Sequence, residues 1–292
     1  MSAHPRLSLN QATIKYASLD EALRVTAEAD YGSIGLWREP VAAVGLEEAA
    51  RRLADSGLRV SSLCRGGFFT LPEGAERRAA IDENRRAIDE TAALAAAGAA
   101  GSAAVLVLVA GGIPAGSTDL VGARARVGDA LAELVPHAAS AGVTLAIEPL
   151  HPMYAADRAV VSTLKQALDL AEPFDASAVG VVVDTFHIWW DPEVFEQIAR
   201  AGASGRIASY QVCDWQTPLP ADVLLARHQP GDGVIDFAAF TRAVEAAGYA
   251  GDIEVEIFNE AIWDAPWPKV VASTARAFDA AVAPHLAAVA TA

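Results

Sequence analysis

Four short apolar segments of the chain carry an oxygen-bearing polar side chain at or near their end. They are VTLAIE ending at Glu148, VGVVVD ending at Asp184, RIASYQ ending at Gln211, and IEVEIF, which contains Glu256. Because side chains alternate along a strand, each of these residues shares its face with small or polar residues, and bulky apolar residues share the other face. This pattern is typical of a closed parallel barrel, whose strands pack on helices outside and end at a carboxyl-terminal mouth.

Along the whole chain, apolar runs with period two alternate eight times with stretches of helical periodicity. Strands are predicted at 7–14, 33–36, 59–63, 104–109, 143–147, 179–183, 206–211 and 253–257. Helices are predicted at 19–29, 46–56, 76–97, 123–141, 164–171, 192–201, 237–247 and from 272 into the C-terminal region. The repeated βα unit and the length of 292 residues predict an α/β fold, a single (β/α)8 TIM barrel over residues 1–292.

The four polar strand ends are separated by 36, 27 and 45 residues, which suits successive βα units of a barrel. The longest interval contains residues 214–233, which are rich in Pro, Gly and Asp and are predicted to form an extended loop at the mouth. A doubly wound open sheet is the competing architecture. It is disfavoured because no glycine-rich phosphate-binding sequence follows the first predicted strand.

The four oxygen-bearing side chains would converge at one mouth, and oxygen ligands suit a divalent cation. A carboxylate buried at the end of an apolar strand is costly unless it is paired or bound to a cation. The sequence therefore predicts a metal site. The alternative is an interior ionic network in which Arg38, Arg65 or Arg227 neutralises the acids.

Histidine and tryptophan gather at the same predicted rim. His187 follows Asp184 by three residues and is predicted to contact a substrate oxygen or a metal-bound water. His151 is open between a substrate contact and a structural loop residue. All six tryptophans follow predicted strands, and their rings, Trp37 and Trp215 among them, could stack on a sugar or cover the mouth in an oligomer.

Composition narrows the classes of partner. A net charge of −15 and a pI near 4.7 disfavour nucleic acid and anionic membrane as partners. Two cysteines far apart indicate neither a disulfide framework nor a cysteine-based zinc site and suit a reducing compartment. No signal sequence or membrane-spanning run is recognised, so a soluble cytoplasmic protein is expected, with homo-oligomerisation open.

Several motifs together resemble one family. They are EPLHP from Glu148, VVDTFH ending at His187, RxxPGDGVID from Arg227 to Asp236, and GYxGxIEVEIF ending at Phe258. With them the chain resembles the xylose isomerase-like TIM-barrel superfamily, and within it the sugar phosphate isomerase/epimerase proteins. The resemblance covers essentially the whole chain.

The resemblance implies that Glu148, Asp184, Gln211 and Glu256 bind one divalent metal. It also implies that Glu148 and Glu256 exchange protons with the substrate, that His187 binds substrate, and that Arg227 lies near it. Gln211 replaces the family's histidine. The resulting all-oxygen ligand set favours Mn2+ or Mg2+, with Co2+ or Zn2+ possible.

The implied activity is that of an isomerase or epimerase that abstracts a proton next to the carbonyl of a keto sugar or polyol-derived substrate, through an enediolate. A lyase or dehydratase on the same site is the alternative, and a non-catalytic sugar-binding subunit is a further one. A phosphodiesterase resembling endonuclease IV would need more histidine ligands and a basic track. His151, Arg65, Arg227, Trp37 and Trp215 are the expected substrate contacts. The absence of a phosphate loop favours an unphosphorylated compound.

Overall fold

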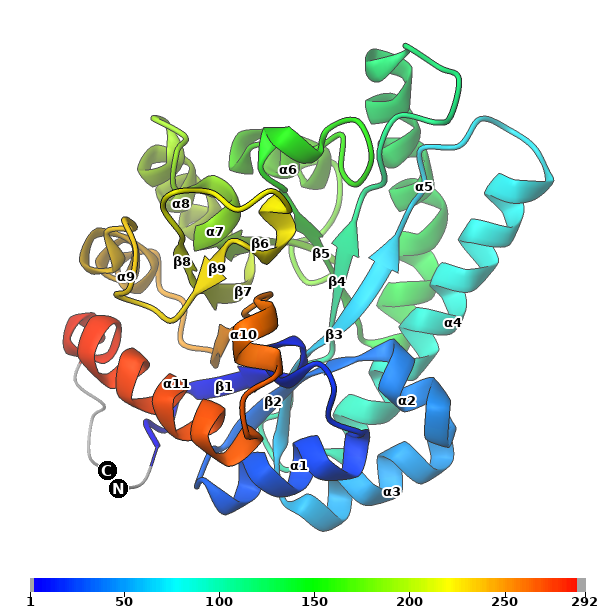
Figure 1. The fold of residues 1–292 in the computed structure, drawn as a ribbon. Helices are drawn as coiled ribbons and strands as arrows, with labels where there is room; N and C mark the ends of the chain where they lie inside the picture. The colour runs from blue at the N-terminus through cyan, green and yellow to red at the C-terminus, as the bar shows by residue number, and fades with distance from the viewer. Residues whose placement is uncertain (1–2, 288–292) are drawn as a thin grey trace.

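The structure, a computed structural model, describes residues 3–287, and eight parallel strands close into a barrel (Figure 1). Around the barrel their order is β1, β10, β7, β6, β5, β4, β3 and β2. Their bounds are β1 (Leu7–Asn10), β2 (Ser33–Trp37), β3 (Arg59–Gly67), β4 (Val105–Val109), β5 (Thr144–Glu148), β6 (Val179–Asp184), β7 (Ile207–Val212) and β10 (Ile253–Val255). The predicted α/β TIM barrel is confirmed.

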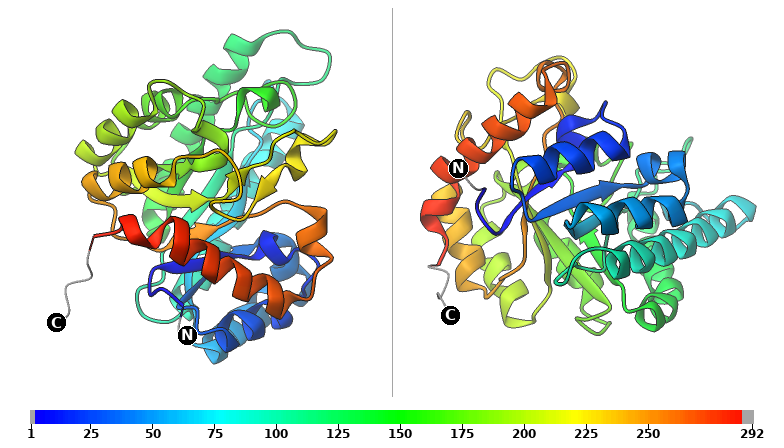
Figure 2. Two further views of the ribbon diagram at one scale, coloured as in Figure 1. Left: turned by 60° about the vertical axis from the view of Figure 1, so that its left-hand side comes forward. Right: turned by 90° about the horizontal axis from the view of Figure 1, so that it is seen from below.

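Helices surround the strands on the outside of the barrel (Figures 1 and 2). The longer ones are α1 (Leu19–Glu28), α3 (Leu46–Ser56), α4 (Ala75–Ala97), α5 (Leu120–Ala141), α6 (Leu164–Ala171), α8 (Val194–Ala203), α9 (Phe237–Ala246) and α11 (Trp267–Ala281). Three short helices that the sequence did not predict come after strands, namely α2 (Arg38–Val44), α7 (Thr185–Ile188) and α10 (Glu260–Trp263). None of the described helices is long and apolar enough to cross a membrane.

Side-chain alternation separates the two faces of each strand, as the sequence pattern predicts. In β5, Leu145 and Ile147 belong to the large cluster of buried residues that includes the helices, whereas Ala146 belongs to a small separate cluster inside the barrel. Val182 of β6 joins that inner cluster. Because the inner residues are small, the barrel interior has room for polar side chains at its carboxyl-terminal end.

Three strand predictions were wrong at their carboxyl-terminal ends, and the one over 59–63 was too short because β3 continues to Gly67. The strand predicted over 7–14 stops at Asn10, because the Asn10 side chain accepts a hydrogen bond from the Ala12 N–H (3.0 Å) and starts a 3₁₀ helix, η1 (Gln11–Ile14). The strand predicted over 253–257 stops at Val255, so Glu256 follows it directly. Helix α11 begins before the predicted residue 272, and the part of that prediction that covers residues 288–292 lies outside the described residues.

The predicted loop over residues 214–233 folds back on itself. Its first two residues, β8 (Asp214–Trp215), pair as an antiparallel ribbon with β9 (Arg227–His228) later in the segment, drawn in yellow-green and yellow in Figure 1. Buried Asp214 anchors the return, because its carboxylate accepts hydrogen bonds from the N–H groups of Gly231 (3.0 Å), Gly233 (2.7 Å) and Ile235 (3.1 Å). A Cβ atom at Gly233 would lie 2.3 Å from the Trp215 carbonyl oxygen, so this close approach requires glycine. The ribbon carries Arg227 to the barrel mouth.

Candidate active site

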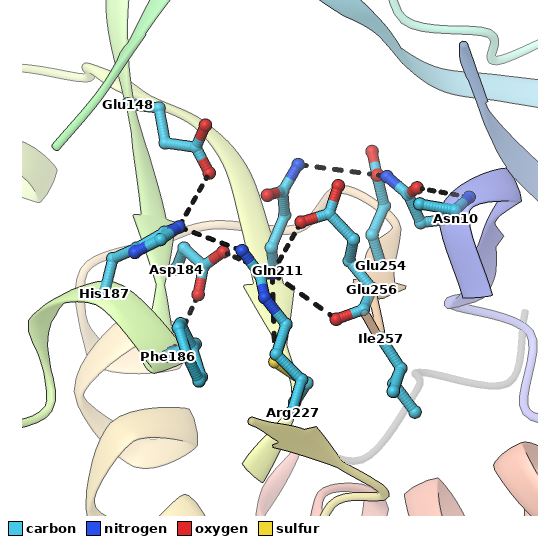
Figure 3. Close-up of polar contacts among 12 residues, drawn as sticks. Asn10, Glu148, Asp184, Phe186, His187, Gln211, Arg227, Glu254, Glu256 and Ile257 are labelled. Carbon is cyan, nitrogen blue, oxygen red and sulfur yellow. Dashed lines mark hydrogen bonds and ion pairs between the residues drawn. The ribbon is translucent and has the colours of Figure 1, made fainter. Parts of the chain in front are cut away.

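Two carboxylates and one imidazole meet at the ends of β5 and β6 (Figure 3). Glu148, Asp184 and His187 are 6%, 1% and 2% exposed, and one ligand atom from each lies within 4.8 Å of the others. Asp184 Oδ1 accepts a hydrogen bond from the Phe186 N–H (2.7 Å) and caps α7, which turns His187 back over the strand end. This buried triad could hold a metal ion.

Arg227 links Glu256 to this triad. Its Nη1 lies 2.7 Å from Glu256 Oε2 and 3.5 Å from Asp184 Oδ2, and its Nη2 lies 3.0 Å from His187 Nε2 (Figure 3). Arg227 is 3% exposed, so these charges interact away from water. Of the three arginines considered for an interior network, Arg227 enters it, whereas Arg38 pairs with Glu83 and Glu90 on α4.

Gln211 lies opposite Asp184 in the β6–β7 register and opposite Glu254 in the β7–β10 register. Its Nε2 points toward Glu254 Oε2 at 3.5 Å. Gln211 Oε1 and Asp184 Oδ2 are buried oxygens that accept no hydrogen bond from any described residue. Buried acceptors without donors are costly, and a cation would satisfy both of them.

A chain of hydrogen bonds fixes Glu254 and, through it, the Gln211 amide. Asn10 Oδ1 accepts from Trp37 Nε1 (2.8 Å) and from the Ala12 N–H, so its Nδ2 must donate to Glu254 Oε2 (2.8 Å). Glu254 is fully buried. Because this carboxylate oxygen can only accept, Gln211 presents its nitrogen to Glu254 and its oxygen to the metal-site side. Asn10 was not among the predicted site residues. The one signal in the sequence was that a polar residue stands at the end of the first strand, among the residues that face the barrel interior.

Burial dominates the protonation of these acids. It raises the pKa of Glu148 well above its usual range, and the neighbouring Glu256 and Asp184 raise this pKa further. Burial raises the pKa of Glu256 to about 7, although Arg227 opposes the shift. Burial also raises the pKa of Asp184, against Arg227 and two backbone N–H groups. A bound divalent cation would lower all three pKa values, because opposite charge favours the ionised form.

His187 is neutral, because burial and the charge of Arg227 lower its pKa well below the usual value. Its Nδ1 lies 3.2 Å from the His151 backbone N–H, and its Nε2 faces Arg227 Nη2. A neutral imidazole has one N–H and one acceptor nitrogen. Either tautomer therefore leaves one ring N–H facing another donor, and the acceptor near Nε2 is Glu148 Oε1 at 4.0 Å.

A pocket of about 460 Å³ opens above these residues. Its wall includes Glu148, Glu256, His187 and Arg227 together with the predicted substrate contacts Trp37 and Arg65, and its other lining residues include Gln11, Lys15, Glu39, Phe68, Tyr154, Arg158, Leu224 and Phe258. Its volume suits a small sugar or cyclic polyol.

Two of the expected substrate contacts are not among the residues that line this pocket. His151 supports His187 through its backbone N–H, and its ring packs against Trp215 with ring centroids 5.1 Å apart. Trp215 also packs against Phe186, and its indole is almost fully buried. Both residues therefore brace α7 from behind the pocket wall.

Comparison of the chain with known proteins shows which family it belongs to. Residues 23–281 match the family described as xylose isomerase-like TIM barrel. The chain belongs to this family. A protein of Sinorhizobium meliloti 1021 with a solved crystal structure is 46% identical, with a TM-score of 0.90, and the match covers 95% of this chain and 98% of that one.

Two curated relatives of this xylose isomerase-like chain are enzymes. The 3-dehydroshikimate dehydratase of Pseudomonas aeruginosa is 34% identical over 169 residues, which cover 55% of this chain and 24% of that protein. The inosose isomerase of Bacillus subtilis (strain 168) is 29% identical over 134 residues, which cover 45% of this chain and 46% of that protein. The matches thus span about a quarter to a half of these relatives.

Proposed function

We propose that the protein is a divalent-metal-dependent isomerase or epimerase that moves a proton next to the carbonyl group of a keto sugar or keto polyol. The observation that carries the proposal is that two buried carboxylates, Glu148 and Glu256, line one pocket together with neutral His187. Two carboxylates at one substrate can remove and return a proton, provided that one is ionised and the other protonated. The inosose isomerase relative supports this reaction type.

Glu148, Asp184, Gln211 and Glu256 would hold the metal ion. This ligand set is supported by the Asp184 and Gln211 oxygens that accept no hydrogen bond from the described residues, and by the cost of burying the carboxylates. Four oxygen ligands favour Mn2+ or Mg2+, and the nearby His187 nitrogen leaves Co2+ or Zn2+ as alternatives. When bound, the ion would supply Lewis-acid stabilisation of the negative charge that develops on the substrate oxygens.

The other site residues orient the substrate. His187 Nε2 and Arg227 Nη2 lie 3.0 Å apart, and a substrate oxygen beside this pair would accept a hydrogen bond from each. Glu256 lines the pocket beside Arg227, where its carboxylate is placed to remove or return a proton. Trp37 offers an apolar ring in the wall for the C–H face of the substrate.

A dehydratase is the second candidate, favoured by the 34% identity to a 3-dehydroshikimate dehydratase. It would use the same first step, removal of a proton next to a carbonyl. The two candidates differ in the second step. An isomerase or epimerase returns the proton to carbon, whereas a dehydratase delivers a proton to a departing hydroxyl, which leaves as water.

The experiment incubates Mn2+-loaded protein in D2O with keto sugars and inososes, and NMR monitors exchange of the proton next to the carbonyl and the products. Metal-dependent exchange is expected, with isomers or epimers as products; an unsaturated product would select the dehydratase. Glu256→Gln should keep the fold and lose exchange, because an amide can ligate a metal but cannot act as a base. No metal-dependent exchange with any compound would refute the proposal. The cytoplasmic location and homo-oligomerisation stay predictions.

A further inference from the structure

Two cations at the pocket have no acidic partner. Lys15 and Arg65 both line the wall, and among residues 3–287 neither forms an ion pair or a side-chain hydrogen bond. Most of the arginines elsewhere pair with carboxylates, as Arg59 does with Asp252 (2.5 Å). In a chain with a net charge of −15, two unpaired cations beside one pocket form a local positive region.

Aromatic rings hold the two cations on one wall. Arg65 Cζ lies 5.6 Å from the centre of the Trp37 ring, and Lys15 Nζ lies 4.5 Å from the centre of the Trp263 ring. Phe258 lies between these rings, with its centroid 5.7 Å from each. The face of an aromatic ring attracts a cation electrostatically and accepts no conventional hydrogen bond from the N–H groups of that cation, whereas a carboxylate would. Both cations therefore keep donors free for an anion.

The rest of the lining gives the pocket an acidic end and a basic end. At the inner end, Arg227 already pairs with Glu256 and lies 4.9 Å from the Phe258 ring. Lys15 Nζ is 5.8 Å from the same ring, so Phe258 is a neighbour of both the inner charges and this second cation. Glu39 is the outer acid of the wall, and within the described part of the chain it forms no ion pair with Lys15 or Arg65.

We propose that Lys15 and Arg65 form an anion subsite, so that the substrate is a keto compound with a carboxylate or phosphate group at the end remote from the reacting carbon. The proposal rests on the proposed function for the inner end of the pocket and adds a charge requirement to it. A guanidinium fork and an ammonium both donate to anionic oxygens, and such hydrogen bonds are stronger than neutral ones. An uncharged keto sugar would leave both cations without an anionic partner.

Calorimetric titration of the Mn2+-loaded protein tests the subsite with three probes, namely D-fructose, 5-keto-D-gluconate and D-fructose 6-phosphate. At least one anion is expected to bind on the order of tenfold more tightly than D-fructose, and the tighter anion identifies carboxylate or phosphate as the preferred group. Lys15→Met and Arg65→Met should each weaken binding of that anion on the order of tenfold, and by a larger factor than they weaken binding of D-fructose. Arg65→Lys, which keeps the charge, should recover part of the loss.

Arg78→Met is the matched control, because Arg78 is an exposed cation on α4 that does not line the pocket. No preference for either anion, no binding of either anion, or an equal loss in Arg78→Met would overturn the subsite. Proton exchange with the same compounds separates this result from the proposed function. Anion binding that depends on Lys15 and Arg65 but comes without exchange of any substrate would support the subsite and count against the reaction.

Discussion

Replacement of Arg227 by methionine should lower the free energy of unfolding more in the metal-free protein than in the metal-bound protein. In the metal-free protein the guanidinium is the cation nearest to Glu256 and Asp184, at 2.7 Å and 3.5 Å. Removal of one partner from a buried ion pair costs about 3–5 kcal/mol, because the remaining charge is unpaired. A divalent cation held by the same two acids would replace the lost charge. The cost should therefore fall to less than half when Mn2+ is saturating.

Urea unfolding with EDTA and with Mn2+ measures this difference in the free energy of unfolding. At a Mn2+ concentration of about 1,000 times its dissociation constant, binding adds about 4 kcal/mol to the stability of a one-site protein. Arg38→Met is the matched control, because Arg38 pairs with Glu83 (2.7 Å) on α4 and should lose the same free energy in both conditions. If Arg227→Met also loses the same free energy with and without Mn2+, the arginine and the ion do not share the acids, and the prediction is wrong.

Three further variants test individual side chains. Burial raises the pKa of Glu256 from 4.5 to about 7, so between these pH values the folded protein binds more protons than the unfolded protein. As pH rises from 4.5 past 7, the metal-free protein should therefore lose about 3 kcal/mol of unfolding free energy relative to Glu256→Gln. A difference in urea unfolding that does not change with pH would contradict this. Gln211→His should shift metal preference toward Zn2+ or Co2+ in competition titrations, and about tenfold weaker binding of every metal would show that residue 211 does not face the ion. Glu254→Gln should keep the fold but weaken Mn2+ binding by about tenfold. The new amide at residue 254 can donate as well as accept, so it no longer fixes which end of the Gln211 side chain faces the ion. Unchanged affinity would assign Glu254 to barrel packing alone.

The barrel and the acids at its mouth were predictable because they depend on local alternation. Glu148 and Asp184 end the strands β5 and β6, and the pattern of inward small residues puts both at the same end of a parallel barrel. Gln211 and Glu256 fit the same pattern, although Glu256 lies one residue beyond its strand. The end of β1 was missed because side-chain capping by Asn10 competes with strand continuation, which apolar alternation does not reveal.

The position of Arg227 could not be read from periodicity. It depends on a loop whose return is fixed by Asp214 and by the close approach of Gly233, two residues 19 positions apart. The resemblance placed Arg227 near the substrate, but its pairing with Glu256 required the tertiary structure. His151 and Trp215 were expected at the substrate for their rim position. The two residues pack behind His187 because of the way α7 turns after β6. The alternation of apolar and polar residues along the strands does not specify this turn.

The most direct test of the metal site is the metal content of the purified protein, combined with anomalous diffraction from crystals grown with Mn2+. We predict one divalent ion per chain, with an anomalous peak bound by oxygens of Glu148, Asp184, Gln211 and Glu256, and with Arg227 moved away from Asp184. A protein that binds no divalent ion at millimolar Mn2+, with Arg227 still paired to Glu256 and Asp184, would contradict the metal site.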